Sequence, residues 1–281
     1  MSDFDEKKNK KRPWAIFTIV RQEPYYLPKW YNYYSQFLPG KDIHIINHCP
    51  ESSKEVDNCC DFLRERCNIY IEKEEFFSSR WIRDTVERYQ KMLLEQYEAV
   101  IFTDVDEIIC IHPSSKLNGL GEFMSAFLAD NKNTNWRVTA YSLIHLPDRG
   151  EPEFDFSKTI FDQRMYWFRD TTYDKPLISK IALKYVLGHH TAANMNKKLH
   201  PHLYMIHLHQ FDLPWYIARH QRWARDFKPS PEDKKNTFNS HYREEKEANL
   251  LFNYYHHMFT KDRITPMLVE RWARETLRKI V

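Results

Sequence analysis

An acidic pair directly follows an apolar run in the first half of the chain. Residues 99–103 read Ala-Val-Ile-Phe-Thr, and Asp104 and Asp106 come next with one valine between them. Carboxylate oxygens at the end of a strand suit Mg²⁺ or Mn²⁺, which also accept oxygens from phosphates and water. The pattern predicts a divalent-cation site that neutralises a diphosphate. A solvated acidic turn is the structural alternative.

Elements that alternate between strand and helix precede this pair. Short apolar runs predict strands at 14–20, 43–47, 68–71 and 99–103. Helical spacing of apolar residues predicts helices at 27–38, 56–66 and 79–97, the last with Ser78 or Ser79 as its cap. Such alternation favours a parallel sheet, and ligands of these sheets bind beyond the carboxyl ends of the strands. Asp104 and Asp106 lie at such an end.

The rest of the chain contains fewer strands and then mostly helix. Further strands are expected at 136–141, 178–186 and 203–208, and a helical pattern runs from Trp215 onward. We therefore predict an α/β fold with a mixed, mainly parallel sheet flanked by helices. The expected organisation is a disordered basic tail (1–12), a catalytic domain (13–212) and a helical C-terminal portion of the same domain (213–281).

Composition narrows the class of protein. The chain has 281 residues and a net charge of +3, which disfavours a dedicated nucleic-acid binder. Basic residues gather at both ends of the chain. We interpret them as a tail and solvated helix faces; a peripheral contact with an anionic membrane is the alternative.

Neither a P-loop nor a complete dinucleotide fingerprint occurs in the sequence, so a bound nucleotide would need another group to hold its phosphates. Residues 1–12 lack the apolar core of a secretory signal, and we expect a cytoplasmic location.

Several segments resemble GT-A glycosyltransferases of the family 2-like group. Residues 18–30, Thr-Ile-Val-Arg-Gln-Glu-Pro-Tyr-Tyr-Leu-Pro-Lys-Trp, are similar to the first strand, turn and helix of that group. Residues 43–47 resemble its second strand, although Asn47 replaces the usual Asp. Residues 102–108, Phe-Thr-Asp-Val-Asp-Glu-Ile, resemble its Asp-x-Asp-Glu segment. The resemblance implies a GT-A domain that transfers a sugar from a UDP- or GDP-type nucleotide diphosphate-sugar to a glycan or other hydroxyl acceptor, with inversion.

The same resemblance implies roles for individual residues. Side chains expected to line the nucleotide pocket are Thr18, Arg21, Glu23, Asn47 and Asp104. Asp106 would bind Mn²⁺ or Mg²⁺ directly, and Asp104 would contact the ribose or a water on the cation. These enzymes often supply a late histidine as a further ligand. His207 and His209 share one face if their segment is extended, and His189–His190 is a second candidate pair.

Inverting transfer also needs a general base for the acceptor hydroxyl. The candidates that the sequence offers are Asp148, Glu151, Glu153, Asp155, Asp162 and Asp174. We favour Asp148 because it closely follows a predicted strand. Two other functions stay open. A haloacid dehalogenase-like phosphoryl-transfer enzyme also places Asp-x-Asp after an apolar strand, and a non-catalytic relative could retain glycan or nucleotide binding.

Overall fold

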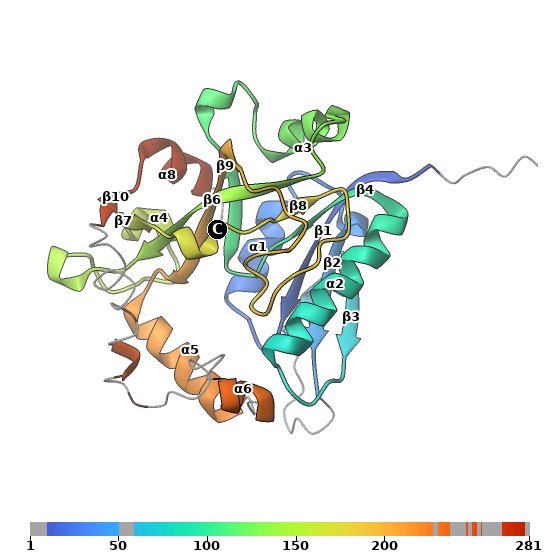
Figure 1. Ribbon diagram of the computed structural model, residues 1–281. Coiled ribbons are helices and arrows are strands. Elements are labelled where there is room, and N and C mark those ends of the chain that lie inside the picture. Colours follow the sequence, from blue (N-terminus) through green and yellow to red (C-terminus); the bar gives the residue numbers. More distant parts are fainter. Residues whose placement is uncertain are drawn as a thin grey trace, which may run out of the picture.

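Ten strands join one mixed sheet within the residues that the computed structural model describes, and helices flank it (Figure 1). The described residues are 10–50, 59–226, 230–236, 246, 249–251, 254 and 266–278. The strands pair in the order β10-β7-β6-β8-β4-β1-β2-β3, and β9 joins β6 to β5. The predicted mixed α/β architecture is therefore confirmed.

The parallel portion of the sheet is formed by the four strands expected ahead of Asp104. They are β1 (Arg12–Val20), β2 (Ile43–His48), β3 (Asn68–Glu72) and β4 (Tyr97–Phe102). β1 lies between β2 and β4, and all three neighbouring pairs are parallel. β1 already begins at Arg12, inside the tail predicted over residues 1–12. Residues 1–9 of that tail lie outside the described residues.

Two helices cover the faces of this parallel portion. α1 (Tyr26–Tyr34) packs against the face that carries Ile16 and Ile45, whereas α2 (Ser79–Gln96) packs against the face that carries Phe17. The strands are apolar in succession because both of their faces are buried. α2 begins as predicted, since the Ser78 hydroxyl accepts a hydrogen bond from the Trp81 amide at 3.1 Å. The short helix predicted over 56–66 lies partly outside the described residues.

The second half of the chain completes the sheet with mostly antiparallel pairs. Its strands are β5 (Glu107–Ile111), β6 (Asn135–Ile144), β7 (Tyr166–Arg169), β8 (Ile178–Ser179), β9 (Leu199–Gln210) and β10 (Met267–Leu268). Among the described strands of this half, only β6 and β9 pair in parallel. The strand predicted over 178–186 was wrong in length. The Ser179 hydroxyl bonds both the amide and the carbonyl of Ile181, at 3.1 and 2.6 Å, and competes with the ladder.

Further α-helices lie between and after these strands. They are α3 (Leu120–Ala129), α4 (Ile160–Gln163), α5 (Leu213–Asp226), α6 (Pro231–Asn236) and α8 (Arg271–Leu277). After residue 212 the described residues include α5, α6 and α8 together with the short strand β10. None of the helices within the described ranges combines the length and apolarity that crossing a bilayer requires.

Aromatic side chains of α1 fix the strand that follows the acidic pair. The Tyr34 hydroxyl donates to the Glu107 carbonyl and accepts from the Ile109 amide, at 3.1 and 3.0 Å. The Tyr33 hydroxyl donates to the Ile109 carbonyl at 2.6 Å. β9 pairs with the opposite edge of β5. Both edges of β5 are therefore hydrogen-bonded, which holds the start of this strand in place.

Candidate functional site

A tight turn separates the two carboxylates of the acidic pair. The Glu107 amide donates to the Asp104 carbonyl at 3.0 Å, and the Glu107 carboxylate accepts from the Asp104 amide at 3.0 Å. These bonds close a four-residue turn between β4 and β5, with aspartate at its favoured first position. Asp104 and Asp106 leave this turn toward different partners. The sequence spacing alone does not show that separation.

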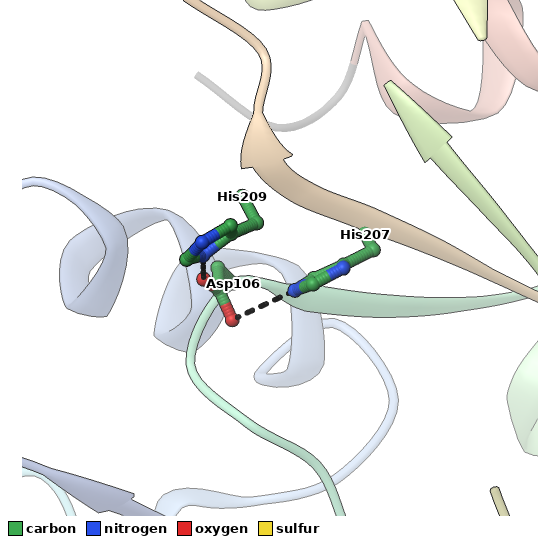
Figure 2. A group of neighbouring side chains, drawn as sticks. All are labelled: Asp106, His207 and His209. Carbon is green, nitrogen blue, oxygen red and sulfur yellow. Dashed lines mark hydrogen bonds and ion pairs between the residues drawn. The ribbon is translucent and has the colours of Figure 1, made fainter. Parts of the chain in front are cut away.

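Asp106 faces two histidines of β9. The Glu107↔His207 register and the 2.8 Å bond from the Leu208 amide to the Asp106 carbonyl bring this end of β9 against the turn. Asp106 lies between the imidazoles in Figure 2, with Oδ1 3.7 Å from His207 Nε2 and Oδ2 3.4 Å from His209 Nδ1. One ligand atom from each of the three residues lies within 4.8 Å of the others. The expected shared face of the two histidines is confirmed.

Hydrogen bonds determine which nitrogen of each histidine faces Asp106 unprotonated. Ser142 Oγ donates to Asp170 Oδ2 at 2.8 Å, so its contact at 3.4 Å with His207 Nδ1 needs a proton on that nitrogen. His207 Nε2 therefore directs a lone pair toward Asp106. Burial lowers the pKa of His207 to about 3, against the opposite influence of Asp106, and this keeps the imidazole neutral at neutral pH.

Arg219 of α5 contacts the same group. Its Nη1 donates to Asp106 Oδ2 at 2.8 Å and lies 3.2 Å from His209 Nδ1. Its Nε and Nη2 donate to Glu23 Oε1 at 3.0 and 2.9 Å. Because arginine only donates, His209 Nδ1 accepts, and the proton of neutral His209 lies on Nε2, 3.1 Å from His220 Nε2. Burial acts to lower the pKa of Arg219, but Glu23 and Asp106 raise it and keep the side chain charged.

Asp104 belongs to a second, neighbouring cluster. Lys175 Nζ lies 2.5 Å from Asp104 Oδ2 and 2.6 Å from Glu107 Oε1, and the lysine side chain is only 1% exposed. His189 Nε2 contacts the same Asp104 oxygen at 3.1 Å. Burial acts to raise the pKa of Asp104, but Lys175 and His189 hold it well below its usual range. Asp104 is therefore ionised, and no described residue donates to its Oδ1.

His189 has an unusual backbone conformation. Its φ is 47°, in the left-handed region that non-glycine residues seldom adopt. Such strain is often concentrated at functional sites. Of the second candidate pair, His189–His190, His189 contacts the acidic segment, at Asp104 rather than at Asp106. The neighbouring His190 instead contacts the Thr172 carbonyl through Nδ1 at 2.8 Å.

The residues expected at the nucleotide lie at the carboxyl ends of β1 and β2. Thr18 and Asn47 share one face of the sheet because Asn47 pairs with Val20, two residues after Thr18. Both are buried, and Thr18 Oγ1 and Asn47 Oδ1 have no partner among the described residues. Arg21 contacts His48 Nδ1 at 3.2 Å and donates to the Asp226 carbonyl at 3.2 Å. Glu23 joins this edge to Asp106 through Arg219.

Asp148, the favoured general base, lies apart from these contacts. It is exposed on a 3-10 turn, Pro147–Arg149, which follows β6. Of the other acids considered, Asp174 Oδ2 pairs with Arg169 at 2.6 Å and Glu151 accepts from two backbone amides. Asp155 and Asp162 are occupied by neighbouring hydroxyls. Asp148 therefore stays a prediction.

A separate cavity opens at the other edge of the parallel strands. Its volume is about 540 Å³. The residues that line it lie at and just beyond the end of β3 and on α2, namely Glu72, Lys73, Glu74, Trp81, Asp84, Thr85 and Arg88. No residue predicted for the site belongs to this lining.

Sequence reasoning missed the two buried cations of the site. Arg219 had a detectable signal, because Tyr216, His220 and Trp223 recur around it at helical spacing and mark a buried face of α5. An arginine on such a face needs a buried acidic partner. Lys175 had no comparable signal, since it lies in a loop between Asp174 and Pro176.

Comparisons with known proteins give only remote likenesses. No protein-family model matches the sequence, and no curated protein matches it. Similar solved structures include S. aureus TarS, 10% identical over 90% of this chain and 44% of that chain, with a TM-score of 0.38. TarS 1-349 with UDP is 12% identical over 90% and 73% (TM-score 0.40), and with UDP-GlcNAc 13% identical over 90% and 74% (TM-score 0.34). This chain thus spans less than half of the longer TarS chain, and likenesses this remote decide neither fold nor function.

Proposed function

We propose that this chain is a GT-A type glycosyltransferase that moves a sugar from a nucleotide diphosphate-sugar to an acceptor hydroxyl, with inversion. The observation that carries the proposal is the convergence of Asp106, His207 and His209 beside the carboxyl end of a parallel strand. A donor of the UDP or GDP type would lie across the ends of β1 and β2. The sequence resemblance around residues 18–30 and 102–108 supports the same assignment.

The three converging side chains would fit a divalent cation once Arg219 Nη1 has left Asp106 Oδ2 and His209 Nδ1. One ionised carboxylate and two neutral imidazoles supply three ligand atoms, and both imidazole lone pairs face Asp106. Nitrogen ligands favour Mn²⁺ over Mg²⁺ within the pair expected from the sequence, although such a set also accepts Fe²⁺ or Zn²⁺. When bound, the cation would stabilise the charge of the diphosphate leaving group.

The chain's own residues would prepare the site for this chemistry. Asp170 and Ser142 fix the orientation of His207, and His220 does the same for His209. Asp104, ionised beside Lys175, offers its unoccupied Oδ1 to a ribose hydroxyl. Thr18 and Asn47 offer buried oxygens without partners to the nucleotide. Asp148 would remove the proton of the acceptor hydroxyl as general base.

A thermal-shift panel tests the donor and the cation together. Nucleotide diphosphates and their sugars are added with and without Mn²⁺, and one nucleotide should raise the melting temperature only when Mn²⁺ is present. Asp106→Asn should abolish that shift and sugar transfer. Asp61→Asn, which removes a surface ion pair with Arg64, should preserve both. A full Mn²⁺-dependent shift in Asp106→Asn would exclude the assigned cation site.

Transfer assays separate the base from the binding residues. Asp148→Asn should lower transfer and leave the Mn²⁺-dependent nucleotide shift intact. If the shift occurs without transfer to any acceptor or hydrolysis of any donor, the non-catalytic binding function replaces the enzymatic one.

A phosphoryl-transfer function has one observation in its favour. Lys175 Nζ lies 2.5 Å from Asp104 Oδ2, and a cation beside an aspartate would also assist attack on a phosphoryl group. Incubation with a phosphate monoester would then label Asp104 covalently. Labelling that is lost in Asp104→Asn would replace the sugar-transfer proposal with this one.

A further inference from the structure

Arg219 holds two of the three atoms that would bind the cation. Its Nη1 lies 2.8 Å from Asp106 Oδ2 and 3.2 Å from His209 Nδ1. Figure 2 shows that these two atoms face each other on one side of Asp106, while His207 approaches the other oxygen. A cation bound to Asp106 Oδ2 and His209 Nδ1 would have to occupy the space that the guanidinium group fills. The two cannot bind these atoms together.

A second set of contacts lets Arg219 leave Asp106 without losing all of its partners. Its Nε and Nη2 both donate to Glu23 Oε1, on the side of the guanidinium group away from Nη1. Glu23 lies just beyond β1, where the donor diphosphate is proposed to bind. Arg219 could thus pivot as a rigid group about Glu23 Oε1, which would carry Nη1 from Asp106 toward a phosphate oxygen.

The buried charges favour this exchange only when an anion arrives. Asp106, Glu23 and Arg219 are each at most 6% exposed, and the Arg219 guanidinium already contacts Asp106 at 2.8 Å. A divalent cation added beside this guanidinium would place two like charges together in a buried site, which is costly. A diphosphate would restore the balance and give Nη1 a new acceptor.

We propose that Arg219 excludes the divalent cation from Asp106 until a diphosphate binds, so that the cation and the donor bind cooperatively. This inference rests on the proposed cation site. It makes Arg219 a positioning residue that couples two ligands, and reciprocal linkage requires each ligand to strengthen binding of the other by the same factor. Couplings of this kind commonly amount to about 5–150-fold.

Calorimetric titration with Mn²⁺ alone tests the exclusion. Arg219→Gln should bind Mn²⁺ at least about tenfold more tightly than the wild type, because the competing cation is gone. The matched control is Arg225→Gln, which removes an arginine of α5 that is 69% exposed and pairs with Asp226, and which should bind Mn²⁺ as the wild type does. Asp106→Asn combined with Arg219→Gln should abolish the gain. Equal Mn²⁺ affinity in Arg219→Gln and the wild type would overturn the inference.

A measurement on the unaltered protein keeps the inference testable if Arg219→Gln does not fold. The wild type is titrated with Mn²⁺ with and without saturating UDP, and with GDP in parallel, after correction for Mn²⁺ bound by the free nucleotide. At least about tenfold tighter Mn²⁺ binding with one nucleotide is expected; equal affinity overturns the inference. If the protein transfers sugar but binds Mn²⁺ equally well with and without nucleotide, only the proposed role of Arg219 is rejected. If nucleotide strengthens Mn²⁺ binding but no sugar is transferred, only the enzymatic function is rejected.

Discussion

Removing the charge of Lys175 should destabilise the fold strongly above pH 8, because this lysine then neutralises two carboxylates in the interior. Burial raises the pKa of Glu107 to about 8, against the opposite influence of Lys175, so both carboxylates are ionised only above that pH. Its ammonium group lies 2.5 Å from Asp104 and 2.6 Å from Glu107, and Glu107 is fully buried. Removing one partner of a buried ion pair typically costs about 3–5 kcal/mol. Asp104 is 31% exposed, so solvent screens part of its contribution. We expect Lys175→Met to lower the free energy of unfolding by about 3–4 kcal/mol at pH 9, where Glu107 is ionised.

Urea denaturation of single and double variants measures this cost. In Lys175→Met/Glu107→Gln no uncompensated charge remains at position 107, and the amide can still accept from the Asp104 amide. The double variant should therefore recover about 1–2 kcal/mol relative to Lys175→Met. A loss below about 1 kcal/mol in Lys175→Met, or no recovery in the double variant, would refute a buried ion pair at this position.

Two further predictions concern His44 of β2 and Gly40, which lies just before β2. Burial and Arg12 lower the pKa of His44 to about 4, from about 6.5 in the unfolded chain. The neutral imidazole therefore contributes fully to the free energy of unfolding above pH 6.5, and this contribution is lost as the pH falls toward 4. In His44→Gln, the free energy of unfolding should fall by about 3 kcal/mol less between pH 6.5 and pH 4 than in the wild type, as measured by denaturation at several pH values. If the free energy of unfolding depends on pH equally in the two proteins, the lowered pKa is contradicted. A Cβ at Gly40 would lie 1.7 Å from the Arg66 carbonyl oxygen, so Gly40→Ala should lower the melting temperature and cost at least about 2 kcal/mol. Gly121→Ala, in α3 with open space around it, should be neutral or stabilising; equal effects of the two would disprove the close approach.

Sequence patterns predicted the parallel strands well because both of their faces are apolar. β2, β3 and α2 lie close to their expected positions, and Ser78 is the expected cap. β5 was not predicted, although the run at 108–111 is apolar and β-branched, because it follows β4 after a single turn. The strand expected at 178–186 stops early because Ser179 bonds its own neighbour's backbone.

Candidate residues for the site could be chosen from the sequence, but their full arrangement could not be derived from it. The shared face of His207 and His209 followed from the two-residue repeat of a strand. The separation of Asp104 from Asp106 depends on the turn that Glu107 closes, and a spacing of two residues is compatible with either arrangement. Lys175 and Arg219 reach the site from segments 71 and 113 residues distant in sequence. No local pattern specifies such pairings, since they depend on the tertiary fold.

The tyrosines of α1 also bear on how this protein avoids self-association. A strand that offers unpaired amides and carbonyls along one side can recruit a strand from another molecule. In β5 the hydroxyl groups of Tyr33 and Tyr34 take up that bonding capacity, as a further strand would. A helix thus ends the hydrogen-bonding of this edge with side chains alone. Phenylalanine at position 34 would remove the partner of the Glu107 carbonyl and the Ile109 amide, next to the acidic turn and in the interior of the protein.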